Sequence, residues 1–446
     1  MKRGACRSWD GLLGAMLLVL GGCVSAAVLG DTAGATDAAV TAPVIDASLV
    51  APVDQSFRNP QKVHTLKLHS EVVGETGAAP RDLVKRQLLY TVGALQKYNG
   101  SANFGSAEIS LGAMSAAGEG LVRIAYDAEL QAVFPKQEAF QFAAEIPLPM
   151  RVDPPSIFAF AAKYKDACGK SVVPGEEGQF FYSYRPAQVG CALEAADVFR
   201  SSSQVVAPLG TAPTTYPEYD RMWADGRMHI VIVMGRYLPG TGMSRSDPFA
   251  AIYWELVEHL HSALQRSSEV RELYTQVPNP RGTPVERATW TVDNANRGFK
   301  FDLFLVDAPQ SGGVAFDAEL KRVSADADFL SYAGHAGLGA NLAAFLQRIE
   351  LNAGQYHLLH LDNCISFAYP DFRLLKNPAS VSGRYGTQDV VVNSASAKRE
   401  ELKPDLLNWL LALTNPNSPK PYSDILRMNS TGRPLVLFDE DNTFQP

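Results

Sequence analysis

A strand–helix–strand pattern between residues 328 and 364 constrains the fold of this 446-residue chain more than any other feature. The first strand, Asp328–Gly334, runs into His335, and the second, Gln355–Asn363, runs into Cys364. The segment Gly339–Glu350 between them carries apolar residues at helical spacing, namely Leu342, Phe345, Leu346 and Ile349. Two strands connected through such a helix are parallel, and the crossover between them is right-handed. We therefore expect His335 and Cys364 at one carboxyl edge of a sheet, where open α/β folds bind their ligands.

The beginning of the chain has the layout of an export signal. A positively charged start precedes the apolar run Leu12–Leu20, and Leu20-Gly21-Gly22-Cys23 resembles the bacterial lipobox. That resemblance implies a lipoprotein signal over residues 1–22 and a lipid on Cys23 as the membrane anchor. Because Val24 follows, we expect the outer membrane of a bacterial cell envelope. The alternative is an ordinary secretory signal that is cleaved near Ala26–Ala27.

The cysteines indicate an oxidising compartment and one odd thiol. Cys6 leaves with the signal and Cys23 is the predicted lipid site, so three cysteines remain. Cys168 and Cys191 flank a turn-rich segment and can form a disulfide, which leaves Cys364 as the reactive candidate. The alternative is that Cys364 is a small buried apolar residue, as free cysteine often is. Its position at the polar end of a strand argues against that.

Composition separates the mature chain into a tether and two domains. Residues 23–54 are rich in Ala, Gly, Thr and Pro and are predicted to be a flexible tether. The remainder, about 390 residues, exceeds what one hydrophobic core usually serves. We expect an accessory domain over 55–212 and a second domain over 218–446. The net charge of −7 and the lack of a Lys/Arg cluster make nucleic acid an unexpected partner.

The accessory domain is predicted to be α+β and mostly β. Val63–His69 and Leu121–Leu130 alternate apolar and polar residues, as half-buried strands do. A helix is expected over Asp82–Leu95, and the aromatic run Phe180–Tyr184 is interpreted as a further strand.

The second domain alternates strand and helix patterns, which indicates an α/β fold with a parallel sheet covered on both faces. The apolar run Met228–Met234 is typical of a strand buried on both faces. The other elements expected in this domain are the helix Phe249–Leu264, the strand Phe301–Val306, a helix around Phe316–Val323, the strand Asp389–Ser394, the helix Pro404–Leu413 and the strand Leu435–Phe438.

In this order the elements resemble the caspase/legumain/gingipain group of cysteine peptidases. In that group the third core strand ends in the catalytic His and the fourth in the catalytic Cys. The strands at Met228 and Phe301 would be the first and second, so His335 and Cys364 close the third and fourth. The resemblance covers Met228–Pro446 and is closest to the gingipain-like branch. It implies a caspase-like, mostly parallel sheet with helices on both faces and cleavage of a peptide or protein substrate.

The resemblance also implies roles for individual residues. His335 would be the acid/base and Cys364 the nucleophile, because a base raises the thiolate fraction of a thiol that is mostly protonated near neutral pH. Backbone N–H groups after these two residues would form the oxyanion hole. The residues expected to contact the substrate are Arg236, Tyr332, Gly334, Ala336, Gly337, Asn363, Asn393 and Ser394.

Two alternatives remain open on the sequence. The chain could be an inactive relative of these peptidases that binds protein or glycan. No cofactor is expected, although Asp439-Glu440-Asp441-Asn442 could hold Ca²⁺ through hard oxygens instead of being a solvated terminal segment. His357 and His360 lie three residues apart on one predicted strand, so they point to opposite faces and predict no metal site.

Overall fold

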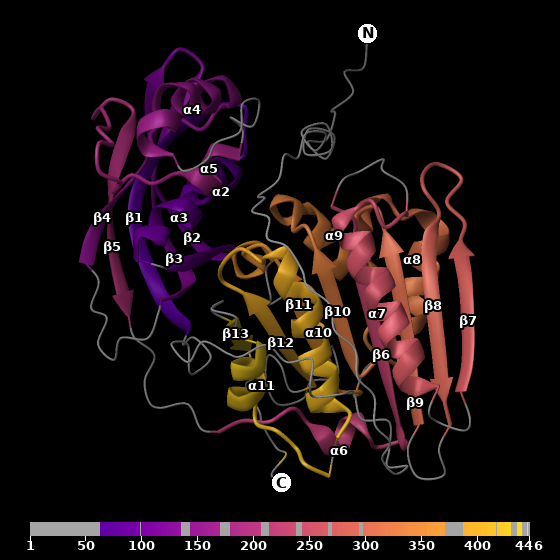
Figure 1. Cartoon of the computed structure of the whole chain (residues 1–446). Coiled ribbons are helices and arrows are strands. Elements are labelled where there is room, and N and C mark those ends of the chain that lie inside the picture. Colours follow the sequence, from indigo (N-terminus) through magenta and orange to yellow (C-terminus); the bar gives the residue numbers. More distant parts are fainter. Residues whose placement is uncertain are drawn as a thin grey trace.

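The computed structural model describes residues 63–98, 100–134, 143–169, 179–206, 214–237, 243–265, 270–293, 298–352, 354–370, 387–415, 417–429, 435–438 and 444. The predicted signal, tether and lipid site at Cys23 lie outside these residues. The described chain is a mixed α/β structure with two sheets, one antiparallel and one mixed (Figure 1). We call the parts that carry them the N-terminal domain (residues 63–206) and the C-terminal domain (residues 214–438).

The N-terminal domain is built on a five-stranded antiparallel sheet, as its alternating segments predicted in outline. The strands are β1 (Val63–Glu75), β2 (Ser101–Gly118), β3 (Leu121–Val133), β4 (Ala143–Pro149) and β5 (Val198–Val206), in the order β2-β3-β1-β5-β4. Its helices are α2 (Pro80–Leu88), α3 (Tyr90–Ala94), α4 (Pro154–Cys168), α5 (Phe180–Ser183) and the 3-10 turn η2 (Leu95–Tyr98). The single helix predicted over Asp82–Leu95 is therefore divided between α2 and α3.

One prediction for this domain is wrong, because the aromatic run at Phe180 forms helix α5 rather than a strand. Phe180 and Phe181 are buried and make edge-to-face contacts with Tyr90 on α3. Packing of these rings against other aromatic side chains stabilises the segment, so it does not have to pair with a strand.

The predicted disulfide is confirmed, with Cys168 at the end of α4 bonded to Cys191 at a Cα–Cα distance of 4.7 Å. It lies beside α5, because Gly169 forms an isolated bridge with Tyr184 and the Arg185 amide donates to the Cys168 carbonyl at 2.7 Å. The bridge and this hydrogen bond hold the end of α5 next to the end of α4, beside the disulfide.

The C-terminal domain contains an eight-stranded mixed sheet in the order β13-β12-β11-β10-β6-β9-β8-β7. The strands are β6 (Arg227–Gly235), β7 (Val270–Val277), β8 (Val285–Val292), β9 (Gly298–Val306), β10 (Phe329–Gly334), β11 (His357–Asn363), β12 (Gln388–Asn393) and β13 (Leu435–Phe438). β9, β6, β10, β11 and β12 are parallel, while β13, β8 and β7 pair antiparallel. The α/β prediction holds in outline, and the antiparallel hairpin β7–β8 was not predicted.

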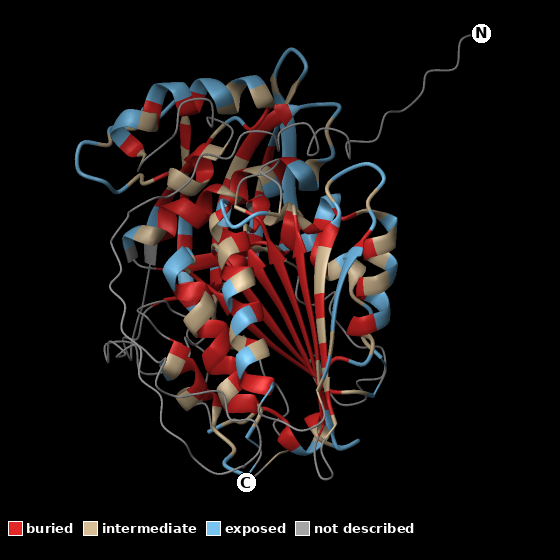
Figure 2. Cartoon of the chain, turned by 45° about the vertical axis from the view of Figure 1, so that its right-hand side comes forward, coloured by how far each residue is buried: buried red, intermediate tan, exposed pale blue. Residues whose placement is uncertain are grey.

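Helices cover both faces of this sheet, and each face has its own apolar cluster. One face packs against α7 (Pro248–Leu264), α10 (Arg399–Leu413) and α11 (Tyr422–Asn429), which lie in front of the sheet in Figure 1. The other face packs against α8 (Gly313–Ser324) and α9 (Ala340–Arg348). The short elements are α6 (Tyr219–Met222), η4 (Pro309–Ser311), η5 (Gly337–Gly339) and η6 (Ser366–Ala368). Figure 2 shows the central strands buried along their length and the outer helix faces exposed.

The chain reverses direction across the sheet between β6 and β10. From β6 it passes through α7 and the hairpin to β9 on one side, and then through α8 to β10 on the other side of β6. A crevice outside the carboxyl ends of strands at such a switch point is where open α/β sheets bind ligands. His335 directly follows β10 and therefore lies at this point.

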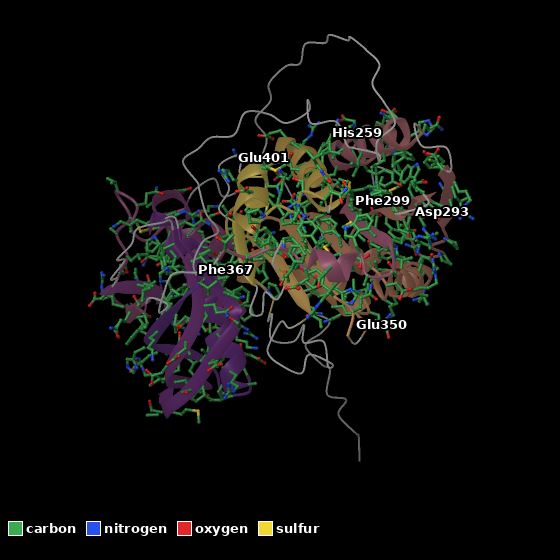
Figure 3. The ribbon with its side chains drawn as sticks, turned by 90° about the horizontal axis from the view of Figure 1, so that it is seen from below. His259, Asp293, Phe299, Glu350, Phe367 and Glu401 are labelled. Carbon is green, nitrogen blue, oxygen red and sulfur yellow. A yellow bond between two sulfur atoms is a disulfide. The ribbon has the colours of Figure 1, made fainter. Side chains whose placement is uncertain are left out.

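The N-terminal domain packs against the loop that follows β11. Figure 3 shows Phe367, from η6, beside the purple ribbon of the N-terminal domain, and Val92 and Val133 belong to the same apolar cluster as Phe367. None of the helices in the described part of the chain is both long and apolar enough to span a membrane.

Candidate active site at the carboxyl edge

The register of β10 and β11 places His335 and Cys364 at adjacent strand ends. Gly334 is paired with Asn363, the last residue of each strand, and His335 and Cys364 come next. Neighbouring strands lie about 4.8 Å apart, so His335 and Cys364 leave the same edge of the sheet side by side. The topology deduced from the sequence is confirmed at this point.

The imidazole of His335 lies between two aromatic rings. The ring centroids of Tyr237 and Phe249 are 5.0 and 5.4 Å from that of His335. Its Nε2 atom lies 3.2 Å from the carbonyl oxygen of Tyr237. A carbonyl only accepts, so Nε2 carries the proton and Nδ1 keeps its lone pair. Burial lowers the pKa of His335, against the opposing effects of this carbonyl and of Asp247. The imidazole is therefore neutral near pH 7, as a base must be.

Asp247 holds the backbone of Tyr237 and Phe249, the two residues whose rings flank the His335 imidazole. Its Oδ1 atom accepts hydrogen bonds from the amides of Tyr237, Phe249 and Ala250, at 3.1, 2.8 and 3.0 Å. The carboxylate caps α7 and also fixes the end of β6. Asp247 was not predicted from the sequence, although an Asp before Pro248 is a recognisable helix start.

The backbone of His335 is held from the other side by two buried side chains. The hydroxyl of Tyr332 donates to the His335 carbonyl at 2.7 Å, and Nδ2 of Asn341 donates to it at 3.1 Å. Tyr332 is fully buried and stacks on Phe345. Asn341 was not predicted, because its contact with the His335 carbonyl depends on how α9 packs against the end of β10.

Cys364 is half-buried and faces the loop after β12. Its thiol donates to the carbonyl of Ala397 over 3.7 Å. The next residue, Ile365, has φ 47° and ψ 42°, the left-handed region that a β-branched residue rarely adopts. Among the described residues it is the one non-glycine residue with positive φ. Such strain persists where the surrounding structure enforces it, often at functional sites.

Buried amides tie the three strand ends together behind Cys364. Nδ2 of Asn363 donates to the Gly334 carbonyl at 3.0 Å. Nδ2 of Asn393, at the end of β12, donates to Asp362 Oδ1 and to the Asn363 carbonyl, at 2.9 and 3.0 Å. These bonds fix the relative positions of β10, β11 and β12 at the edge where the reactive residues lie.

Four residues that were expected to contact substrate have buried side chains in the structure. Arg236 is 2% exposed and forms an ion pair with Asp307. Tyr332, Asn363 and Asn393 are 0% exposed and make the bonds described above. Their geometry supports a bracing role, because a side chain enclosed in this way does not present its polar atoms at the surface.

The other four residues that were expected to contact substrate would do so mainly through their backbone atoms. Gly334 has φ 153°, and an added Cβ would lie 3.1 Å from the backbone of Gly235. Ala336 has an ordinary helical φ of −64°, while Gly337 has φ 58°, so the left-handed residue after His335 is a glycine. Ser394 is 7% exposed. Substrate contact by these four residues stays a prediction.

The described residues contain no group of three or more His, Cys, Asp and Glu side chains arranged to hold a metal ion. Nδ1 of His357 lies 2.6 Å from the Ala327 carbonyl, and Nδ1 of His360 lies 3.1 Å from the Ser331 hydroxyl. The acidic segment Asp439–Asn442, considered for Ca²⁺, lies outside the described residues.

The chain matches no protein-family model, and no curated protein is similar to it in sequence.

Proposed function

We propose that the chain is a cysteine endopeptidase whose C-terminal domain has a caspase-like, gingipain-like arrangement. The observation that carries the proposal is the pairing of Gly334 with Asn363, which brings His335 and Cys364 to adjacent ends of parallel strands. The neutral imidazole, the fixed Nε2 proton and the strained residue after Cys364 support it. The lipobox-like segment ending at Cys23 supports a membrane-tethered form of the enzyme.

The proposed reaction has two stages. Nδ1 of His335 takes the proton of the Cys364 thiol, and the thiolate attacks the carbonyl carbon of the scissile peptide. Backbone N–H groups stabilise the resulting oxyanion, and the imidazolium returns the proton to the leaving amine, which gives a thioester and a free amino terminus. Water then loses a proton to the same imidazole and attacks the thioester carbonyl. The C–S bond breaks, the acyl group leaves as a carboxylic acid, and the imidazolium returns the proton to the thiolate, which regenerates the thiol.

The test is cleavage of a peptide library by the full chain in detergent micelles, read by mass spectrometry. Cys364→Ala should abolish turnover, and His335→Ala should lower kcat by about 10³ or more, because each change removes the activated nucleophile. His69→Ala is the matched control, since His69 pairs with Asp127 on the exposed face of β1 and β3.

Cleavage that persists in Cys364→Ala would refute the mechanism. A wild-type chain that cleaves no peptide and whose Cys364 resists thiol-reactive peptidyl probes would instead be the inactive, binding-only relative.

A further inference from the structure

The N-terminal domain contacts both loops that surround Cys364. Tyr182 on α5 and Ser396, after β12, share a hydrogen bond of 2.5 Å between their hydroxyl oxygens. Nδ2 of Asn103 on β2 donates to the Pro370 carbonyl at 3.1 Å, in the loop that follows β11. Phe104 packs edge-to-face on Tyr369 in the same loop, with centroids 5.8 Å apart.

The first of these contacts ends one residue from Ala397, whose carbonyl accepts a hydrogen bond from the thiol. Ser396 immediately precedes Ala397, whose carbonyl accepts from Cys364. A hydrogen bond that fixes Ser396 therefore also limits where the Ala397 carbonyl can lie. The N-terminal domain is therefore connected to the sulfur of Cys364 through Ser396 and Ala397.

The loop after β11, which contains Tyr369 and Pro370, provides an independent link between the N-terminal domain and both His335 and Cys364. Burial raises the pKa of Tyr369, and the electrostatic effects of Tyr182 and Cys364 raise it further. An added Cβ at Gly339, in the turn after His335, would lie 2.9 Å from the Cβ of Tyr369. An added Cβ at Gly105 would lie 2.1 Å from the Tyr369 carbonyl oxygen, so β2 approaches this loop backbone to backbone.

We propose that the N-terminal domain is part of the catalytic unit and that Tyr182 is a positioning residue. Through its hydrogen bond to Ser396 it places the Ala397 carbonyl, which in turn orients the Cys364 thiol. The catalytic consequence rests on the proposed function, whereas the orientation of the thiol is measurable without turnover. Backbone contacts of Tyr184 and Arg185 with the end of α4 hold α5 in place next to the Cys168–Cys191 disulfide.

The experiment measures alkylation of Cys364 by iodoacetamide in the full chain between pH 5 and 10, read on the Cys364 peptide by mass spectrometry. Loss of the Ala397 acceptor removes a hydrogen bond that favours the protonated thiol. Tyr182→Phe should therefore move the midpoint of the pH profile downward and raise the alkylation rate at pH 7 about threefold, equivalent to about half a pH unit. Ser396→Ala should do the same, and the double variant should add nothing, because both changes break one bond.

Tyr184→Phe is the matched control. Tyr184 lies two residues away and donates to the Pro147 carbonyl within the N-terminal domain at 2.9 Å, so its profile should overlay that of the wild type. Ser396 is exposed, so Ser396→Ala keeps the test available if Tyr182→Phe fails to fold.

Profiles of Tyr182→Phe or Ser396→Ala that overlay the wild type would overturn the proposal, as would additive effects in the double variant. Peptide cleavage is measured on the same samples. Shifted profiles without any cleavage by the wild type would support the positioning role and remove the proposed function, so the two fail separately.

Discussion

Replacement of Asp247 by Ala tests whether one carboxylate holds the backbone of Tyr237 and Phe249, whose rings flank His335. Three backbone amides donate to its Oδ1 atom, and the side chain is 0% exposed. Each hydrogen bond contributes about 1 kcal/mol net, so we expect Asp247→Ala to lower the free energy of unfolding by about 3 kcal/mol. Asp247→Asn keeps an acceptor oxygen and should lower it by about 1 kcal/mol, since mainly charge is lost.

The matched control is Asp153→Ala, because Asp153 also precedes a proline and caps α4. It is 4% exposed but accepts from one backbone amide, that of Ser156 at 3.1 Å. The expected loss is about 1 kcal/mol, the usual contribution of an N-cap side chain. Urea unfolding measures both variants. If Asp247→Ala is no more destabilising than Asp153→Ala, the three amides do not depend on this carboxylate and the reasoning is refuted.

The same variant should change the titration of His335. The charge of Asp247 raises the pKa of His335, in opposition to burial. Its removal should therefore lower that pKa further, which an NMR titration of the imidazole Cε1 proton would detect. An unchanged titration would show that Asp247 acts on His335 through the loop alone.

Three further outcomes are expected. Replacement of both Cys168 and Cys191 by Ser should lower the free energy of unfolding by about 3 kcal/mol, because the chain between them is no longer closed in the unfolded state; equal urea midpoints would contradict this. Burial raises the pKa of Asp328 to about 8, so the folded state keeps a proton that the unfolded chain releases near pH 4. Stability should thus fall by about 1.4 kcal/mol per pH unit as the pH rises between these values, and Asp328→Asn should remove that slope in urea unfolding at pH 5 and 8. Cys23→Ser should abolish palmitate labelling and detergent partitioning, and an equally membrane-bound variant would exclude the lipid anchor.

Periodicity was sufficient to predict the elements of the parallel core. The apolar run at Met228 lies on β6, which is covered on both faces, and the helical spacing after Phe249 lies on α7. The parallel pairing of β10 and β11 followed from the one amphipathic helix between them, α9. These features are local, so the sequence alone determines them.

Contacts between distant segments could not be predicted in the same way. The Tyr182–Ser396 hydrogen bond joins residues 214 positions apart, and no pattern in either segment indicates the other. α5 was interpreted as a strand because aromatic residues favour strands, whereas packing against Tyr90 decides its conformation. Asn363 and Asn393 were expected to contact substrate because polar residues at strand ends often do, but here they bond to neighbouring strand ends.

Several unfavourable local features gather around Cys364. Ile365 adopts a left-handed conformation that costs about 1–3 kcal/mol. The side-chain oxygens of Asn363 and Asn393 are buried without a hydrogen-bond partner among the described residues, and each such group costs about 1–3 kcal/mol. Apolar residues at these positions would avoid the unpaired oxygens, but they could not fix the ends of β10, β11 and β12 through the Nδ2 atoms. A chain that kept the fold only for binding through another surface would have no physical need to place these features beside a half-buried thiol. The left-handed Ile365 directly follows the thiol, and strain of this kind persists where the surrounding structure enforces it, often at functional sites, so it supports the peptidase over the inactive relative.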